Sequence, residues 1–151
     1  MALPPISADA LLRAQITYCE GVRSMPYADT RGNVTIGIGW NLTANGLPDW
    51  AISALYDQAI ADADAALDHV CPWWRSLDAV RGRVMQNLMF NMGPATLAKF
   101  PLFLAAMQAG RWGEASDQLG NSAWYGEVGR RGPLLTKMIT SGLDPALPEA
   151  S

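Results

Sequence analysis

The chain has few of the side chains that hold metal ions or cross-link small domains, with two cysteines and one histidine among 151 residues. Cys19 and Cys71 lie far apart and form no CxxC pattern, so neither a disulfide framework nor a zinc site is expected, and both are predicted to be small core residues. His69, close to the expected end of a helix, is predicted to be solvated. We therefore predict no metal ion and no cofactor.

Long hydrophobic runs are also missing, because no stretch approaches the roughly 18 apolar residues that a membrane span needs. Asp9 and Arg13 interrupt the apolar stretch near the start of the chain, which argues against a signal peptide. Stable insertion into a membrane and an export signal on this chain are therefore not expected.

Positive charge is scarce in the first half of the chain. Residues 1–70 carry eight acidic and three basic side chains, residues 71–151 carry six acidic and eight basic ones, and the formal net charge is −3. A nucleic acid is normally met by a strong net positive field, so nucleic-acid binding is not expected. A chain of this length buries roughly 70% of its unfolded surface as one domain, which predicts a single domain over residues 1–151.

The first part of the chain predicts a helix and then a β-hairpin. Ser7 can cap a helix that runs from about residue 8 to Glu20. After a turn, residues 34–42 alternate between large apolar side chains at even positions and small or polar ones at odd positions, the pattern of one strand with a buried face. Gly37 and Gly39 on the other face indicate that another group approaches this backbone closely, although a pair of bulges or a close-packed helix stays open as the alternative.

The remainder predicts helices. Residues 49–70 have the spacing of a helix with few buried positions. A strongly apolar helix follows, which begins at Ser76 or Asp78 and ends at Gly93. The last helix covers about residues 133–141.

These elements predict an α+β fold with two lobes. The small β-hairpin lobe covers about residues 21–48, and a connecting helix covers about residues 49–70. The larger helical lobe covers about residues 71–142 and includes the N-terminal helix, residues 8–20. A cleft between the lobes is the default place for a ligand.

Three side chains around the hairpin can carry chemistry. Glu20 stands in the last turn of its helix, at the negative end of the helix dipole, which favours the protonated form unless a cation intervenes. Asp29 stands in a polar turn whose backbone donors keep a carboxylate ionised. One acid and one base are what cleavage of a glycosidic bond requires, and the Thr35 hydroxyl can hold a water. Taken alone, these are ordinary residues, and an exposed helix-end glutamate and a turn aspartate with no catalytic role are the simpler interpretation.

Two separate stretches resemble a known family. The first reads EGVR at residues 20–23, PYADT at 26–30 and GNVTIGIG at 32–39; the second reads SLDAVR at 76–81, FNMG at 90–93, RW at 111–112 and WY at 124–125. Both resemble the phage T4-type lysozymes, the endolysin muramidases of glycoside hydrolase family 24. The family pattern is a glutamate, an aspartate nine residues on, and a threonine six further inside a T-[IV]-G-x-G strand, all of which are present.

The resemblance implies a lysozyme-like fold and a glycosidase. The expected reaction is hydrolysis of the β-1,4 bond between N-acetylmuramic acid and N-acetylglucosamine in bacterial peptidoglycan, with inversion. Glu20 is then the general acid, and Asp29 and Thr35 position and activate the attacking water. The expected partner is peptidoglycan, and the expected state is a monomer.

The resemblance also implies substrate contacts. Phe90 and Asn91 are expected to line the cleft, and Phe103 and Gln118 to contact saccharide or peptide stem. A plain core role for the two phenylalanines stays open, and the tryptophans and tyrosine of the second stretch fit the core better. Arg131 resembles the cation near Glu20, which opposes the dipole effect and leaves the protonation of that carboxylate undecided. We also count Asn41 among the candidate substrate-binding residues.

The chain departs from the family in three ways. Trp40 stands where histidine is frequent, so stacking or core packing has to replace an ion pair. The segment between Leu42 and Ser76 is short, which predicts a trimmed hairpin lobe and a more open cleft. The net acidity predicts weak electrostatic steering to an anionic wall.

Two other functions remain open. A non-catalytic lysozyme-like module binds the wall and releases no reducing ends, and a lytic transglycosylase uses Glu20 alone and makes 1,6-anhydro products. Without an export signal, a bacteriolytic protein of phage lysis is expected to stay in the cytoplasm of its host bacterium until a holin-like pore or another route releases it to the periplasm and cell wall. A secreted toxin effector looks the same at this level.

Overall fold

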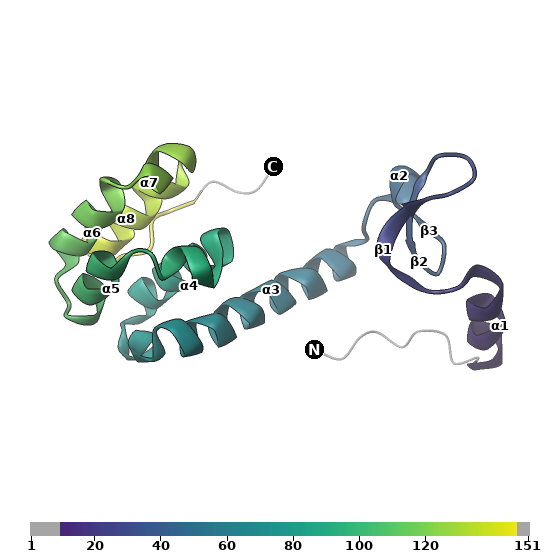
Figure 1. Ribbon diagram of the computed structural model, residues 1–151, viewed down its shortest axis with the longest axis horizontal. Coiled ribbons are helices and arrows are strands. Elements are labelled where there is room, and N and C mark those ends of the chain that lie inside the picture. Colours follow the sequence, from purple (N-terminus) through teal and green to yellow (C-terminus); the bar gives the residue numbers. More distant parts are fainter. Residues whose placement is uncertain (1–9, 148–151) are drawn as a thin grey trace. The chain divides into compact units, whose positions relative to one another are not determined.

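The computed structural model describes residues 10–147, and the chain divides into two compact units, Met1–Ala54 and Leu55–Ser151. Helices and a small three-stranded antiparallel sheet make up the described residues (Figure 1), so the predicted α+β class is confirmed. That the whole chain forms one domain, with the N-terminal helix in the helical lobe, stays a prediction.

The first unit holds the sheet and the elements that flank it. They are α1 (Ala10–Glu20), β1 (Arg23–Ala28), β2 (Val34–Gly37), β3 (Trp40–Asn41), α2 (Leu42–Asn45) and the first turns of α3 (Asp49–Val70). The α1 helix ends where predicted, because Gly21 adopts φ +71° and its N–H donates to the Thr17 carbonyl at 2.8 Å. The expected cap at Ser7 lies outside the described residues.

The sheet corrects the single strand expected over residues 34–42. β1 pairs with β2 and β2 with β3, all antiparallel, and a turn at Ile38–Gly39 separates β2 from β3. Gly37 and Gly39 have φ +68° and +90°, conformations that residues with a side chain rarely adopt, and they let the chain reverse inside the T-I-G-I-G run. The alternating pattern therefore continued through a turn that only the two glycines signalled.

The buried face of that strand was also predicted wrongly. Val34, Ile38 and Trp40 are 46%, 53% and 43% exposed, whereas Thr35 at an odd position is only 4% exposed. Alternating residues lie on one face of a sheet only as long as they belong to the same strand. β2 has just four residues, so the pattern over residues 34–42 does not describe a single face. The Trp40 indole is therefore not in a core; its Nε1 donates to the Gly46 carbonyl at 2.7 Å.

The second unit is helical. It holds the rest of α3, the 3₁₀ turn η1 (Pro72–Ser76), α4 (Ala79–Leu97), α5 (Pro101–Gln108), α6 (Trp112–Gly120), α7 (Ala123–Glu127) and α8 (Arg131–Ser141). The predicted connecting helix over residues 49–70 is confirmed as α3. Asp78, rather than Ser76, caps α4, because its carboxylate accepts from two backbone N–H groups of the first turn. At Gly93 the chain kinks, with φ 74°, and turns helical again as far as Leu97.

The core of this unit lies between α3, α4, α5, α6 and α8, which Figure 1 shows gathered together. The largest fully buried side chains include Phe103, Leu67, Met85, Leu88, Leu119 and Ile139. Apolar side chains on nearly every side of α4 put that helix in the middle of the core, as its sequence predicted.

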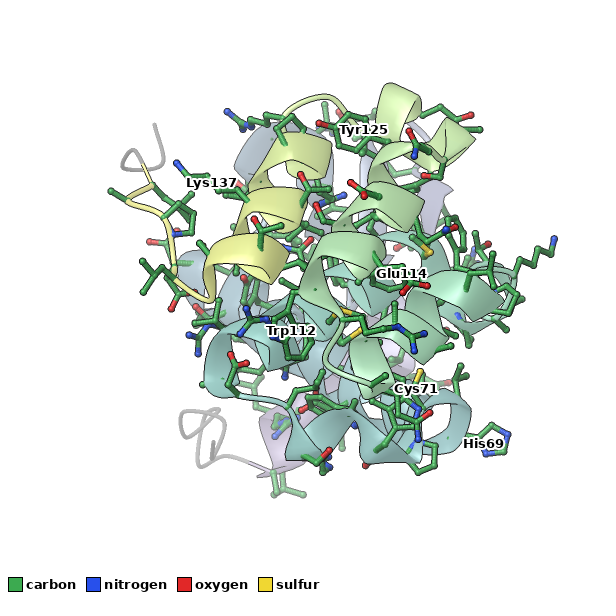
Figure 2. All side chains as sticks on the ribbon, turned by 90° about the vertical axis from the view of Figure 1, so that its left-hand side faces the viewer. His69, Cys71, Trp112, Glu114, Tyr125 and Lys137 are labelled. Carbon is green, nitrogen blue, oxygen red and sulfur yellow. The ribbon has the colours of Figure 1, made fainter. Side chains whose placement is uncertain are left out.

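Arg81 joins three elements of this unit. Its guanidinium lies 4.0 Å from the centre of a Trp112 ring, donates to the Ile139 carbonyl at 2.8 Å and pairs with Asp78 at 2.8 Å. Figure 2 shows Trp112 on the face that carries α6 and α8. The contact links the start of α4 to α6 and α8.

The cysteines and the histidine divide as follows. Cys71 is fully buried, as predicted, but Cys19 is exposed, so its assignment to a core is wrong. α1 has no buried residue. His69 is exposed in the last turn of α3, where Figure 2 shows it pointing away from the ribbon.

None of the helices in the described part of the chain is long and apolar enough to span a membrane.

Candidate active site

The three residues predicted to carry the chemistry all lie in the first unit. Glu20 is the last residue of α1, Asp29 stands in the loop between β1 and β2, and Thr35 lies on β2. The loop and the strand hold Asp29 and Thr35 close together, since both hydrogen-bond the backbone of Asn33.

The Glu20 carboxylate lies against the turn between β2 and β3. A Cβ added to Gly39 would stand 3.3 Å from Glu20 Oε2, closer than ordinary packing allows. Glu20 is otherwise exposed. The close approach predicted from the strand glycines is confirmed at Gly39, whereas nothing lies within 4 Å of a Cβ at Gly37, where glycine is needed only for its backbone angle.

Replacing Gly39 should therefore harm the site more than the fold. We expect Gly39→Ala to lower turnover by about ten-fold to a hundred-fold, because the new methyl group displaces the Glu20 carboxylate by a fraction of an ångström or more. Gly46→Ala is the matched control, since Gly46 also has a positive φ, +61°, but has nothing within 4 Å of an added Cβ.

Both changes also strain the backbone, because both positions have a positive φ, and Gly46, with ψ −159°, lies in a region that is essentially confined to glycine. Thermal melting and turnover on purified sacculi are measured side by side. A Gly39→Ala protein that loses no more activity than Gly46→Ala would contradict the close contact between residue 39 and the glutamate.

Asp29 is held by the loop that follows it. Its Oδ1 accepts from the backbone N–H groups of Arg31 and Asn33, both at 2.8 Å, and its Oδ2 accepts from Asn33 Nδ2 at 3.0 Å. The hydrogen bond from the Asn33 side chain, followed by the bond from the Asn33 backbone, lowers the pKa of Asp29 below its ordinary value, whereas burial acts in the opposite direction. The loop therefore favours the ionised form of this carboxyl, as the composition of the turn predicts.

Thr35 is the buried polar residue among those described, at 4% exposed. Its hydroxyl donates to the Asn33 carbonyl at 3.3 Å, and its Cα partners across the sheet are Tyr27 and Asn41. Because the hydroxyl proton is directed to a carbonyl, the oxygen retains its lone pairs and can accept a hydrogen bond from a water.

The predicted substrate-binding residues are spread over both units. In the first unit, Asn41 caps α2, its Oδ1 accepting from the Ala44 N–H at 2.9 Å, so its amide nitrogen keeps both donors. In the second unit, Phe90 and Arg131 line the same pocket of about 420 Å³. Phe90 is 57% exposed.

This pocket has features that the sequence did not suggest. Its other lining residues come from α3 and α4: Tyr56, Ile60, Ala63, Arg83, Gln86 and Asn87. Asn87 Oδ1 is buried and has no hydrogen-bond partner among the described residues. Arg83 pairs with Asp144 and Gln86 donates to Asp64 at 2.7 Å, whereas the described residues supply no partner for the Arg131 guanidinium.

The other three candidates do not line the pocket. Asn91 accepts a hydrogen bond from Trp124 Nε1 at 2.7 Å and so links α4 to α7. Gln118 is half-buried on α6. The Phe103 ring is 1% exposed and packs in the core, which is the alternative that the sequence left open for it.

The burial of Phe103 predicts a large effect on stability. We expect Phe103→Ala to cost about 3–5 kcal/mol of unfolding free energy, because truncation leaves a cavity among close-packed side chains. Leu102→Ala is the matched control on the same helix, since Leu102 is 61% exposed, and should change stability by less than about 0.5 kcal/mol. Urea unfolding of both variants decides this, and unchanged stability with a raised KM for Phe103→Ala would restore its saccharide role.

Comparison with known proteins places these residues in a family. The family model for phage lysozyme matches residues 17–137, which includes Glu20, Asp29 and Thr35. The chain belongs to the phage lysozyme family. The resemblance drawn from the two sequence stretches is thereby confirmed, and the sheet and helices are those of the lysozyme-like α+β fold.

Several relatives of this lysozyme-family chain are known by name. The pre-baseplate central spike protein Gp5 of Enterobacteria phage T4 is 28% identical over 167 residues, covering 92% of this chain. The chain spans only 28% of the length of that spike protein. A probable T4-type lysozyme 2 of Dictyostelium discoideum is 25% identical, covering 87% of this chain and 94% of that protein, and a probable T4-type lysozyme 1 is 22% identical. Membership of the family supports a lysozyme-like peptidoglycan hydrolase activity.

Proposed function

We propose that the chain is a muramidase that hydrolyses the β-1,4 bond between N-acetylmuramic acid and N-acetylglucosamine, with inversion at the anomeric carbon. The observation that carries the proposal is the contrast between two carboxylates of one unit. Glu20 lies exposed beside Gly39, whereas Asp29 is held ionised by three hydrogen bonds. A proton donor and an ionised base are the pair that an inverting glycosidase needs.

The steps follow from these groups. Glu20 gives its proton to the glycosidic oxygen as the bond from that oxygen to the anomeric carbon breaks, and positive charge develops on the sugar ring. A water held by Thr35 and Asp29 attacks the anomeric carbon from the opposite face, and its proton passes to Asp29. Each cycle consumes one water and leaves a reducing end, after which proton exchange with solvent restores both carboxyl groups.

The predicted substrate-binding residues of each unit form part of the proposal. The exposed Phe90 ring offers an apolar face of the kind that stacks on a hexose. The Arg131 guanidinium, which has no partner among the described residues, suits a carboxylate of muramic acid or of a peptide stem. Asn41 keeps two amide donors for a sugar hydroxyl or acetamido group. Asn91 and Gln118 are retained as weaker candidates, since the Asn91 amide oxygen is already bonded to Trp124.

Product analysis tests the function directly. Purified sacculi are digested with the chain, and the soluble fragments are separated and weighed by mass spectrometry. Fragments that end in reducing N-acetylmuramic acid support the muramidase, and proton NMR of the first product formed should show the α-anomer.

The alternatives give other products. Fragments that end in 1,6-anhydro-muramic acid would instead identify a lytic transglycosylase, which needs Glu20 alone. Binding to sacculi without release of any reducing end would identify a wall-binding module. Either outcome would overturn the proposed hydrolysis.

A further inference from the structure

Asn33 joins the two groups that are proposed to hold the attacking water. Its backbone N–H donates to Asp29 Oδ1 at 2.8 Å, and its side-chain Nδ2 donates to Asp29 Oδ2 at 3.0 Å. Its carbonyl oxygen accepts from the Asp29 N–H at 2.9 Å and from the Thr35 hydroxyl at 3.3 Å. One residue therefore contacts both oxygens of the carboxylate and the neighbouring hydroxyl.

The Asn33 side chain supplies something that the loop backbone does not. Asp29 Oδ1 takes two backbone N–H groups, whereas the donor to Oδ2 among the described residues is Asn33 Nδ2. Without Nδ2, only the two hydrogen bonds to Oδ1 oppose rotation of the carboxylate about its Cβ–Cγ bond. Because a carboxylate oxygen has two lone-pair directions, a single donor on Oδ2 leaves the other direction free for a water.

We propose that Asn33 is a positioning residue, whose carboxamide sets the plane of the Asp29 carboxylate so that the free lone pair of Oδ2 faces the attacking water. The inference rests on the proposed function, since it assigns Asn33 a role in the hydrolysis proposed above. The arrangement has the character of a supporting hydrogen bond behind a reacting group, which fixes geometry without itself touching substrate.

The hydrogen bond from Asn33 Nδ2 to Asp29 Oδ2 also affects the pH at which Asp29 becomes protonated. It stabilises the ionised form of Asp29 and is the largest of the causes that lower the pKa of that carboxyl. Arg31 is the charged side chain that acts on Asp29 among the described residues, with the smallest effect, and it is unchanged in the variants below. Loss of Nδ2 therefore raises the pKa of Asp29, and the protonated, inactive form persists to higher pH.

Two variants separate the hydrogen bond from its surroundings. Asn33→Asp keeps the shape of the side chain but places a negative oxygen where the donor was, and Asn33→Ala removes the group without adding charge. Both keep the backbone N–H that bonds Asp29 Oδ1. Asn45→Asp is the control, because Asn45 is exposed on α2 and has no hydrogen bond to Asp29.

The readout is kcat/KM on solubilised peptidoglycan across pH 3–8, a range of about five units around the titration of a carboxylate. We expect kcat/KM of both variants to fall by about ten-fold or more below neutral pH. The acid limb of the pH profile should move to higher pH, and it should move further in Asn33→Asp than in Asn33→Ala. The limb in Asn45→Asp should match the parent. A lower rate with an unmoved limb would show a merely structural role and overturn the inference, and so would a parental profile in both variants.

A second measurement does not depend on hydrolysis. Carbon-13 NMR of the Asp29 carboxyl in the full chain should titrate at higher pH in Asn33→Ala than in the parent, and the Asn33 side-chain amide protons of the parent should shift together with Asp29. If the chemical shifts of the Asn33 side-chain amide protons in the parent do not change as Asp29 titrates, the inference is overturned, even if both variants fail to fold. If the parent releases no reducing ends while these shifts are seen, the proposed function falls and the hydrogen-bond role of Asn33 stands.

Discussion

Glu20→Gln is expected to lose turnover on purified sacculi by about a hundred-fold to ten-thousand-fold, the range that a positioned proton donor contributes. Glutamine has nearly the shape of glutamate and fits beside Gly39, but its amide cannot deliver a proton to the glycosidic oxygen. Glu20 is exposed at the end of α1, so the melting temperature should stay within a few degrees of the parent.

The control for this variant is Glu127→Gln. Glu127 is also exposed and is also the last residue of a helix, α7, so the two changes remove the same charge from the same kind of position. Glu127→Gln should keep the parental rate. A Glu20→Gln protein that is folded and retains more than a tenth of the parental rate would show that Glu20 is not the proton donor.

Asp29→Asn is the second large loss, and we expect turnover to fall by a similar factor because an amide cannot take the proton of the attacking water. The loop should survive the change. The asparagine oxygen can still accept from the backbone N–H groups of Arg31 and Asn33, and the Asn33 amide can turn its oxygen toward the new NH₂ group. Asp57→Asn is the control, because Asp57 is exposed on α3, and it should keep the parental turnover.

The pH dependence of stability gives Asp29→Asn a second readout. The pKa of Asp29 is lowered in the folded chain, chiefly by Asn33, so the carboxylate stabilises the fold above its unfolded pKa. That contribution is lost as pH falls through the folded value. The variant should therefore lose less stability than the parent on acidification, measured by urea unfolding at a series of pH values. A parental rate in Asp29→Asn would eliminate the mechanism with two carboxylates.

Elements whose sequence pattern acts over a few neighbouring residues were predicted more accurately than the strand, whose pattern continued through a turn. The connecting helix over residues 49–70 and the end of the last helix at residue 141 were predicted correctly, because helical periodicity and helix-ending residues act within a few positions of each other. Residues 34–42 were predicted wrongly as one strand. The alternation of apolar side chains continued across Ile38 and Gly39, although the backbone reverses there at two glycines with positive φ.

Which side chains are buried was harder to predict from the sequence than where the helices begin and end. The apolar face of the expected strand is exposed and Thr35 is buried, since burial depends on which elements cover a face and not on the face itself. Cys19 and Cys71 show the same point, as two similar residues of which only Cys71 entered a core. Phe103 and Phe90 were left open between core and substrate, and packing placed Phe103 in the core and Phe90 at a pocket.

The sequence by itself singled out Glu20, Asp29 and Thr35 as the candidates for the chemistry, because their types and spacing are local properties of one short stretch. It also determined the α+β class, through helical periodicity and a turn-rich hairpin. Only the tertiary structure showed that Glu20 lies against Gly39, that Asn33 holds both oxygens of Asp29, and that Trp124 bonds Asn91 across 33 positions. Contacts of this kind depend on where the backbone brings two side chains together, and no pattern along the chain records that distance.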